Sequence, residues 1–157
     1  MNNFHQTNPT IFMKKIAISK FLVISIFISK NVFSQDPICK KWLTEEGTSM
    51  VRIFLANDGK YYGKIVWLRD SLYKGRPMID SENPDKTKRQ NSWLGIQLIS
   101  GLIKKNAFEY INGKIYDPTK GNYYNCKMTI EKNKLILRGY ILGLPFLGRT
   151  TTWSLVE

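Results

Sequence analysis

Two arginines in the last third of the chain, Arg138 and Arg149, have side chains that could bind an anion. Arg138 lies inside the apolar segment 135–141, and Arg149 follows a glycine shortly before the final apolar segment. An arginine inside a small domain needs a carboxylate or an anionic ligand, because an unpaired buried charge is costly. Two interpretations therefore stay open. The arginines form structural pairs with Asp117 or Asp80, or they bind the carboxylate or phosphate of a ligand.

A second group of polar side chains occupies a turn and the long polar connection between residues 69 and 92. Asp80 and Asn83 lie in that connection, and loops often carry binding residues, so both are ligand candidates. Asp117 begins Asp-Pro-Thr-Lys-Gly, a sequence typical of a turn. Asp80 and Asp117 could also act as acid and base on a glycosidic bond. A solvated loop and a simple turn are the structural alternatives.

The first 34 residues have the composition of a targeting segment rather than of a folded domain. A basic stretch from Met13 to Lys20 precedes an apolar run from Phe21 to Ile28, and a polar stretch ends at Ser34. This order is typical of a secretory signal peptide, and the run is far short of the ~20 residues that span a membrane. We expect residues 1–34 to be an upstream extension and a cleavable signal peptide, with an uncleaved anchor as the alternative. Residues 35–157 then form one domain, periplasmic or secreted, without a transmembrane segment.

The histidine and cysteine content limits which catalytic, metal-binding and disulfide sites the domain could contain. The only histidine, His5, lies in the segment expected to be removed. The mature domain would then lack the imidazole of a nucleophile–base pair or a zinc site, and we expect no metal and no cofactor. Cys39 and Cys126 could form a disulfide in an exported protein. Alternatively, Cys126 packs as a small hydrophobe at an inward strand position.

The chain is strongly basic, with a formal net charge of +12 at pH 7. Such a charge favours anionic surroundings, including lipid headgroups and acidic polysaccharides. Export argues against a nucleic acid partner. The basic side chains are spread along the sequence, so a surface that serves solubility alone is the alternative.

The sequence after the leader consists of short apolar segments separated by turn signals. Asn57-Asp58-Gly59-Lys60 and Asn112-Gly113 both predict hairpin turns. Residues 124–131 alternate strictly, which places Tyr124, Cys126, Met128 and Ile130 on one buried face of a strand. Roughly eight such strands and no amphipathic helix predict an all-β, up-and-down antiparallel barrel, with a sandwich as the alternative. The four tryptophans are expected in its core: Trp42, Trp67, Trp93 and Trp153.

Several short motifs, in a fixed order, give the chain a recognisable pattern. They include Cys39-Lys-Lys-Trp42, Asp80-Ser-Glu-Asn83-Pro84, Gly113-Lys-Ile-Tyr-Asp117-Pro118 and Leu147-Gly148-Arg149. The pattern resembles the exported bacterial family catalogued as domain of unknown function 2147. The resemblance implies a small lipocalin-like, or calycin-like, barrel outside the cytoplasm. Cys39 departs from it, because a glycine is expected before the first tryptophan, and this argues against a family-wide disulfide.

The leading hypothesis is an exported barrel that binds a small apolar or amphipathic ligand in its cavity, with the ligand's anionic end near an arginine. The alternatives are an envelope-surface protein that binds lipid or polysaccharide, and a carboxylate-based enzyme that acts on a glycan or cell-wall substrate. The candidate ligand contacts are Arg138, Arg149, Asp80, Asn83, Asp117 and Tyr124.

Overall fold

The structure, a computed structural model, describes residues 1, 36–70, 72–73, 75–141 and 144–156. The chain separates into two units, Met1–Ser34 and Gln35–Glu157, and the account below concerns the second. The expected signal peptide and its cleavage site lie outside the described residues. In the part that is described, no helix combines the length and the apolar character needed to cross a bilayer.

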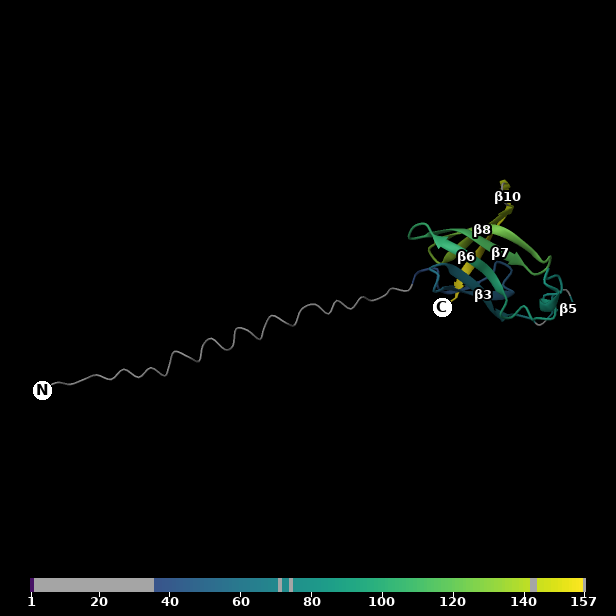
Figure 1. The fold of residues 1–157 in the computed structure, drawn as a ribbon, viewed down its shortest axis with the longest axis horizontal. Helices are drawn as coiled ribbons and strands as arrows, with labels where there is room; N and C mark the ends of the chain where they lie inside the picture. The colour runs from purple at the N-terminus through teal and green to yellow at the C-terminus, as the bar shows by residue number, and fades with distance from the viewer. Residues whose placement is uncertain (2–35, 71, 74, 142–143, 157) are drawn as a thin grey trace. The chain divides into compact units, whose positions relative to one another are not determined.

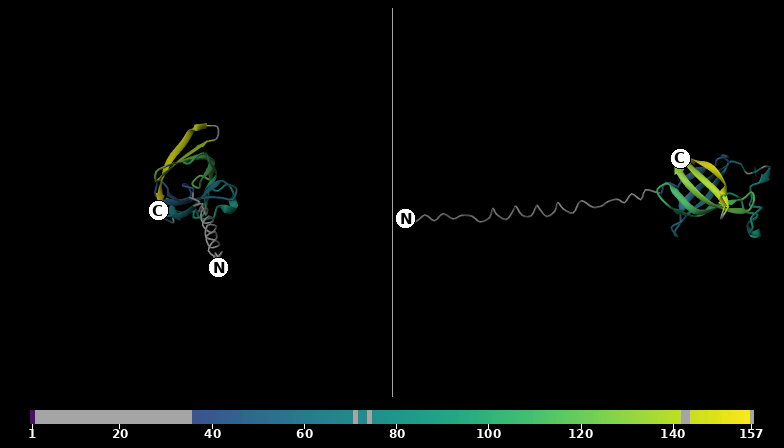
Figure 2. Two further views of the ribbon diagram at one scale, coloured as in Figure 1. Left: turned by 90° about the vertical axis from the view of Figure 1, so that its left-hand side faces the viewer. Right: turned by 90° about the horizontal axis from the view of Figure 1, so that it is seen from above.

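Within the described residues, eight strands close into an antiparallel barrel in the order β1-β10-β9-β8-β7-β6-β3-β2 (Figures 1 and 2). The strands are β1 (Lys41–Leu43), β2 (Ser49–Leu55), β3 (Tyr61–Leu68), β6 (Gln97–Lys104), β7 (Glu109–Asp117), β8 (Asn122–Glu131), β9 (Lys134–Ile141) and β10 (Leu144–Val156). Successive barrel strands are neighbours, so the chain runs up and down around the wall. Closure removes the open edges that a sheet would otherwise expose. The predicted all-β class and up-and-down barrel are confirmed.

The two turn signals have different outcomes. The segment after Ala56 forms the predicted β2–β3 turn, in which Gly59 has a φ of 75° and Asp58 Oδ1 accepts a hydrogen bond from the Lys60 amide at 3.1 Å. The predicted hairpin at Asn112-Gly113 is wrong. Both residues lie inside β7, where the pairing with β8 shifts register, and Asn112 takes a positive φ of 59°. The backbone freedom of this pair produces a strand irregularity instead of a turn.

One end of the barrel is filled by residues 36–40 and by aromatic side chains of the wall. Ile38 is fully buried, and its carbonyl accepts a hydrogen bond from the indole Nε1 of Trp42 at 2.9 Å. The Asp36 carboxylate accepts hydrogen bonds from the hydroxyls of Tyr61, at 2.8 Å, and of Tyr110.

Lys104 Nζ lies 2.6 Å from the same Asp36 carboxylate. Burial raises the pKa of Asp36, but the hydrogen bonds from Lys104, Tyr110 and Tyr61 outweigh it and hold that pKa below its usual value. The segment that closes this end is thus tied to β3, β6 and β7.

Cys39 and Cys126 are both free thiols and both buried, so the structure does not contain a disulfide between them. Burial raises the pKa of both thiols, that of Cys126 to about 12. Cys126 points inward from β8, where it packs as the small hydrophobe of the second alternative.

The Asp36 contacts predict an acid-dependent contribution to stability. The folded-state pKa of Asp36 lies below the reference value of 3.8. Its stabilising effect is therefore present above that value and is lost as the pH falls through the folded value. Asp36→Asn should lower the free energy of unfolding at neutral pH by about 1–3 kcal/mol. It should also flatten the pH dependence of stability between about pH 5 and about pH 2.

Urea denaturation across this pH range checks the prediction, with Asp70→Asn as the matched control. Asp70 pairs with Arg69 at 3.2 Å on the surface, and both side chains are more than half exposed. Equal effects of the two variants would show that Asp36 has no special part in closing the barrel.

Candidate functional site

The other end of the barrel is hollow. A cavity of about 680 Å³ opens there, between the barrel wall and the loops that join the strands. Its wall is mostly apolar and includes Ile65, Leu98, Ile115, Leu137 and Trp153. Its rim carries hydroxyl and charged groups, among them Thr44, Glu46, Ser49, Asp117, Lys120 and Arg149. The cavity therefore combines an apolar interior with a polar entrance.

The hollow depends on the side chains that point inward from β9. Leu135 and Leu137 are buried in this phase, and Gly139, the next inward position, lines the cavity. A Cβ atom at Gly139 would meet no atom closer than Ile115 Cγ2, at 3.6 Å, which is ordinary van der Waals contact. The missing side chain at Gly139 thus leaves space that the wall does not refill.

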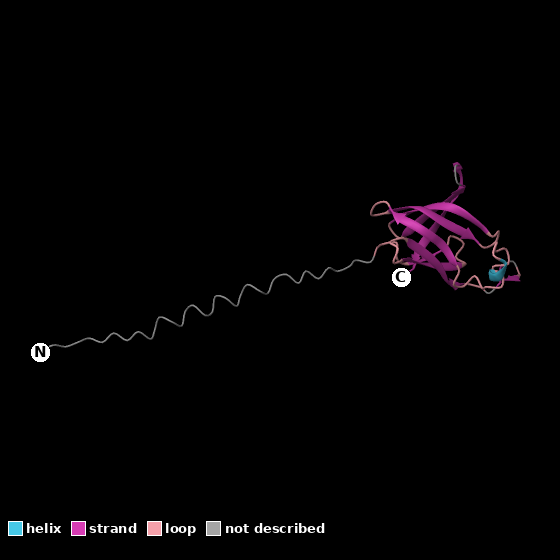
Figure 3. Cartoon of the chain, viewed as in Figure 1, coloured by secondary structure: helices cyan, strands magenta, loops and turns pink. Residues whose placement is uncertain are grey.

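The long β3–β6 connection covers one side of the cavity entrance. It contains a small hairpin, β4 (Leu72–Tyr73) and β5 (Arg76–Pro77), and the short 3₁₀ helix η1 (Lys86–Lys88), which stands out among the strands in Figure 3. Met78 and Trp93 line the cavity from this connection, and the Trp93 amide donates to the Met78 carbonyl at 2.8 Å. The connection is therefore folded, and its two ends are joined beside the entrance.

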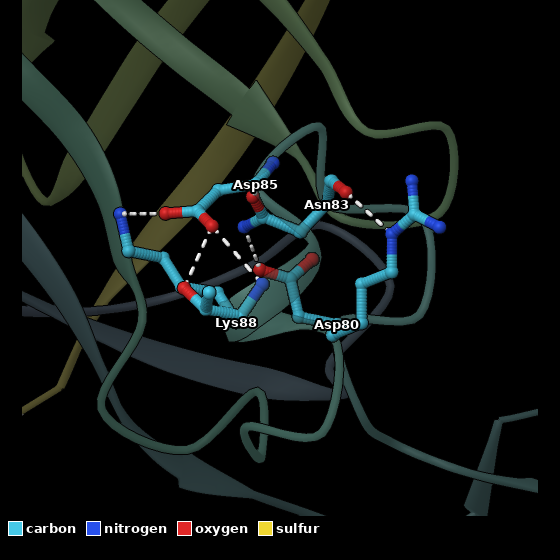
Figure 4. Close-up of polar contacts among 6 residues, drawn as sticks. Asp80, Asn83, Asp85 and Lys88 are labelled. Carbon is cyan, nitrogen blue, oxygen red and sulfur yellow. Dashed lines mark hydrogen bonds and ion pairs between the residues drawn. The ribbon is translucent and has the colours of Figure 1, made fainter.

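A buried polar network holds this connection in place, and Figure 4 shows those of its contacts that lie within the connection. Asp80 and Asn83 are 2% and 6% exposed. Asp80 Oδ1 accepts a hydrogen bond from the Tyr116 hydroxyl at 2.6 Å, and Oδ2 accepts one from Asn83 Nδ2 at 2.5 Å. Arg89 Nε donates to the Asn83 carbonyl at 2.8 Å. Oδ1 of Asp80 thus ties the connection to β7, and Oδ2 fixes Asn83 within the connection.

The acidic side chain next along the connection caps η1. Asp85 Oδ1 accepts hydrogen bonds from the Thr87 hydroxyl and amide, and Lys88 Nζ lies 3.1 Å from Asp85 Oδ2. These contacts, that of Thr87 above all, lower the pKa of Asp85 to about 2. The carboxylate of Asp85 is therefore occupied by local structure.

The connection also packs directly against the β7–β8 turn. Gly121 has a φ of 67°, and a Cβ atom there would lie 1.8 Å from the Glu82 carbonyl oxygen. Only glycine suits both the backbone conformation and the close approach. The turn itself is built as its sequence predicts, because Asp117 Oδ1 accepts hydrogen bonds from the Thr119 amide at 3.0 Å and hydroxyl at 2.6 Å.

Comparison with known proteins identifies the family and the fold to which this barrel corresponds. The profile of a bacterial family described as "Uncharacterized protein conserved in bacteria (DUF2147)" matches residues 40–154. The chain belongs to this family. Its fold is similar to that of protein HP1028 from the human pathogen Helicobacter pylori, which is described as a member of the lipocalin family. The TM-score is 0.67, at 26% identity over 76% of this chain and 83% of that one. No match was found among curated proteins. The expected family and lipocalin-like barrel are confirmed.

The structure of this DUF2147 protein divides the predicted ligand contacts into two sets. Asp117, Tyr124 and Arg149 line the cavity. Asp80 and Asn83 do not, since they are buried in the network that anchors the long connection.

The expectation that Arg138 points into the barrel is wrong. Arg138 Nη1 donates to Thr150 Oγ1 at 3.2 Å, and Nη2 donates to the Phe146 carbonyl at 3.4 Å, on the outer side of the β9–β10 hairpin. Leu135 and Leu137 face the interior from β9. Because side chains alternate along a strand, Arg138 in the next position faces outward. Arg149 pairs with Glu46 at 3.3 Å rather than with Asp117 or Asp80.

Several cavity residues were not identified as such from the sequence. Trp93 and Trp153 were expected simply to be core, and both are buried, yet they also line the cavity. The alternation of Thr151 and Trp153 along the last strand is a signal that could have placed both on the inner wall. Trp67 is 37% exposed, because the pairing of β2 and β3 shifts register just before it.

The described residues contain no cluster of three or more histidine, cysteine, aspartate or glutamate side chains that could hold a metal ion. The groups that face the cavity can instead make apolar contacts, donate hydroxyl hydrogen bonds and present one arginine and one lysine at the entrance.

The contact at Gly121 gives a test of how the long connection is held. Gly121→Ala should destabilise the protein by more than Gly59→Ala, which changes a residue of φ 75° with no atom within 4 Å of the added Cβ. The control measures the backbone strain alone, roughly 1–2 kcal/mol. Gly121→Ala adds the clash with Glu82, so it should also speed tryptic cleavage at residues 86–89.

Urea denaturation and timed digestion measure the two effects. The same loss of stability in both variants, with unchanged cleavage, would mean that the connection does not depend on this contact.

Proposed function

We propose that this protein binds a small apolar or amphipathic molecule in its barrel cavity. The observation that carries the proposal is the cavity of about 680 Å³, apolar along its wall and polar at its rim, in a barrel whose other end is filled. This volume lies within the ~300–1,000 Å³ of typical small-molecule sites. Lipocalin barrels hold one small ligand in the same place.

The wall supplies the driving force for binding an apolar body. Each Å² of apolar ligand surface removed from water is worth about 25 cal/mol. The wall residues Ile65, Ile115 and Trp153 come from β3, β7 and β10, which are spread around the barrel, so they would surround such a body on several sides. A ligand with a long apolar portion therefore suits the interior better than a uniformly polar one.

The rim carries two carboxylates, Glu46 and Asp117, and two cations that would meet a polar or anionic end of the ligand. Arg149 and Lys120 lie at the entrance beside hydroxyl groups such as that of Ser49. The side chains of Arg149 and Glu46 are 78% and 54% exposed, and ion pairs this exposed contribute little to stability. Arg149 can therefore leave Glu46 and meet a ligand carboxylate at small cost.

The proposed place of action is outside the cytoplasm, in the periplasm or beyond the cell. The basic, apolar and polar order of residues 13–34 supports this proposal. In such a compartment the protein would carry or sequester its ligand.

Filling the cavity tests the proposal. Gly139→Phe places a ring in the open space beside Ile115, so it should weaken binding of the fluorescent probe N-phenyl-1-naphthylamine by at least about tenfold. Ile136→Phe is the matched control, because it adds a ring of the same kind on the outward phase of β9. Circular dichroism confirms that both variants fold. Equal probe affinity in the two variants would place the probe outside the cavity.

The arginine at the rim has a separate test. Arg149→Ala should weaken binding of dodecanoic acid by roughly threefold to tenfold and leave that of its methyl ester unchanged, because only the acid carries a charge. Arg138→Ala, on the outer face, should affect neither. Calorimetric titration of both compounds supplies the affinities. If the acid and ester lose affinity equally in Arg149→Ala, the charged contact is not made.

A further inference from the structure

The β9–β10 hairpin stands out from the barrel beside the cavity entrance. Figures 1 and 2 show the two strands continuing past the rest of the wall. The described part of its end carries four exposed apolar side chains, here called the apolar tip: Ile141, Leu144, Phe146 and Leu147. Phe146 is 72% exposed. Apolar side chains gathered in this way on a soluble domain mark a surface that contacts a partner or a membrane.

Basic side chains lie directly behind the apolar tip. Arg138 and Arg149 stand on the two strands of the hairpin, and Lys127 of β8 is directly opposite Arg138 in the sheet. Like charges at directly opposed positions destabilise a sheet. Glu46 offsets part of the charge of Arg149, and Glu109 interacts electrostatically with Lys127, whereas the salt bridges of the described residues do not include Lys127.

The order of these groups fits a lipid surface with anionic headgroups. A segment that enters the membrane interface has an apolar portion that reaches the acyl boundary and basic side chains at headgroup level. Arginine and lysine can extend along the apolar portion and keep their charge in water. The hydrogen bond from Arg138 to the Phe146 carbonyl holds a charge next to the tip.

We propose that the β9–β10 hairpin docks this protein onto an anionic lipid surface, with the apolar tip in the interface and Lys127, Arg138 and Arg149 against the headgroups. Ile141, Leu147 and Arg149 also line the cavity entrance. Docking would therefore bring the entrance next to the bilayer, where an amphipathic molecule could pass between lipid and cavity. That last consequence rests on the proposed function, whereas docking itself does not.

Vesicle sedimentation tests the proposal. The protein is produced by export with its own leader, its mass is measured, and it is mixed with vesicles of phosphatidylglycerol and phosphatidylcholine. Leu144→Ser/Phe146→Ser should weaken vesicle binding by at least about tenfold. The matched control is Leu55→Ser/Phe108→Ser, which changes two side chains of similar exposure at the filled end. The control should bind within about twofold of the unaltered protein.

A second variant separates charge from apolar insertion. Lys127→Glu/Arg138→Glu should lose binding to the anionic vesicles. Raising the salt concentration should likewise weaken the vesicle binding of the unaltered protein. Neither Leu144 nor Phe146 lines the cavity. The tip variant should therefore keep its affinity for N-phenyl-1-naphthylamine without vesicles, which distinguishes failed docking from a failed cavity.

Two results would overturn the proposal. One is vesicle binding by the tip variant that equals that of the unaltered protein and the control. The other is a self-association, seen by sedimentation velocity, that the tip variant abolishes while vesicle binding stays the same. In that case the apolar tip contacts a second copy of the chain and not lipid.

Discussion

The carboxylate of Asp36 joins three strands of the wall to the segment that closes one end of the barrel. It accepts hydrogen bonds from residues on β3, β6 and β7, and so holds residues 36–40 across that end. Tyr61 and Tyr110 meet edge to face beneath it, with ring centroids 5.1 Å apart. An eight-stranded barrel is just wide enough either to be filled by side chains or to hold one small ligand. In this protein one half is filled by side chains and the other contains the cavity, which opens away from Asp36.

Two inward-facing glycines show how the halves differ. A Cβ atom at Gly113, in the filled half, would come within 2.6 Å of the Leu102 side chain. Glycine is needed there because the interior is full. At Gly139 an added Cβ would make only ordinary contact, and the space beyond belongs to the cavity. The same residue type therefore permits close packing in one half and leaves a hollow in the other, and the sequence alone does not distinguish the two.

What could be predicted from the sequence depended on local periodicity. The alternation of residues 124–131 identified a strand and its inner face, because polar side chains marked the outer one. The same argument did not place Arg138, because apolar residues occupy both phases of β9. In the folded barrel Leu135 and Leu137 face inward, so Arg138 faces outward. Asn112 was assigned to a turn because a positive φ serves turns and bulges alike. The role of Asp80 depends on Tyr116, a tertiary partner that no local pattern indicates.

The four tryptophans provide the most direct test of the cavity as the ligand site. Trp93 and Trp153 line it, Trp42 is buried at the filled end, and Trp67 is partly exposed outside. Nitrogen-edited NMR resolves their indole N–H signals during a titration with dodecanoic acid. We predict saturable shifts of the Trp93 and Trp153 signals, with those of Trp42 and Trp67 unchanged. Binding of the acid that shifts Trp67 alone, or that leaves Trp93 and Trp153 in place, would contradict a ligand site inside the barrel.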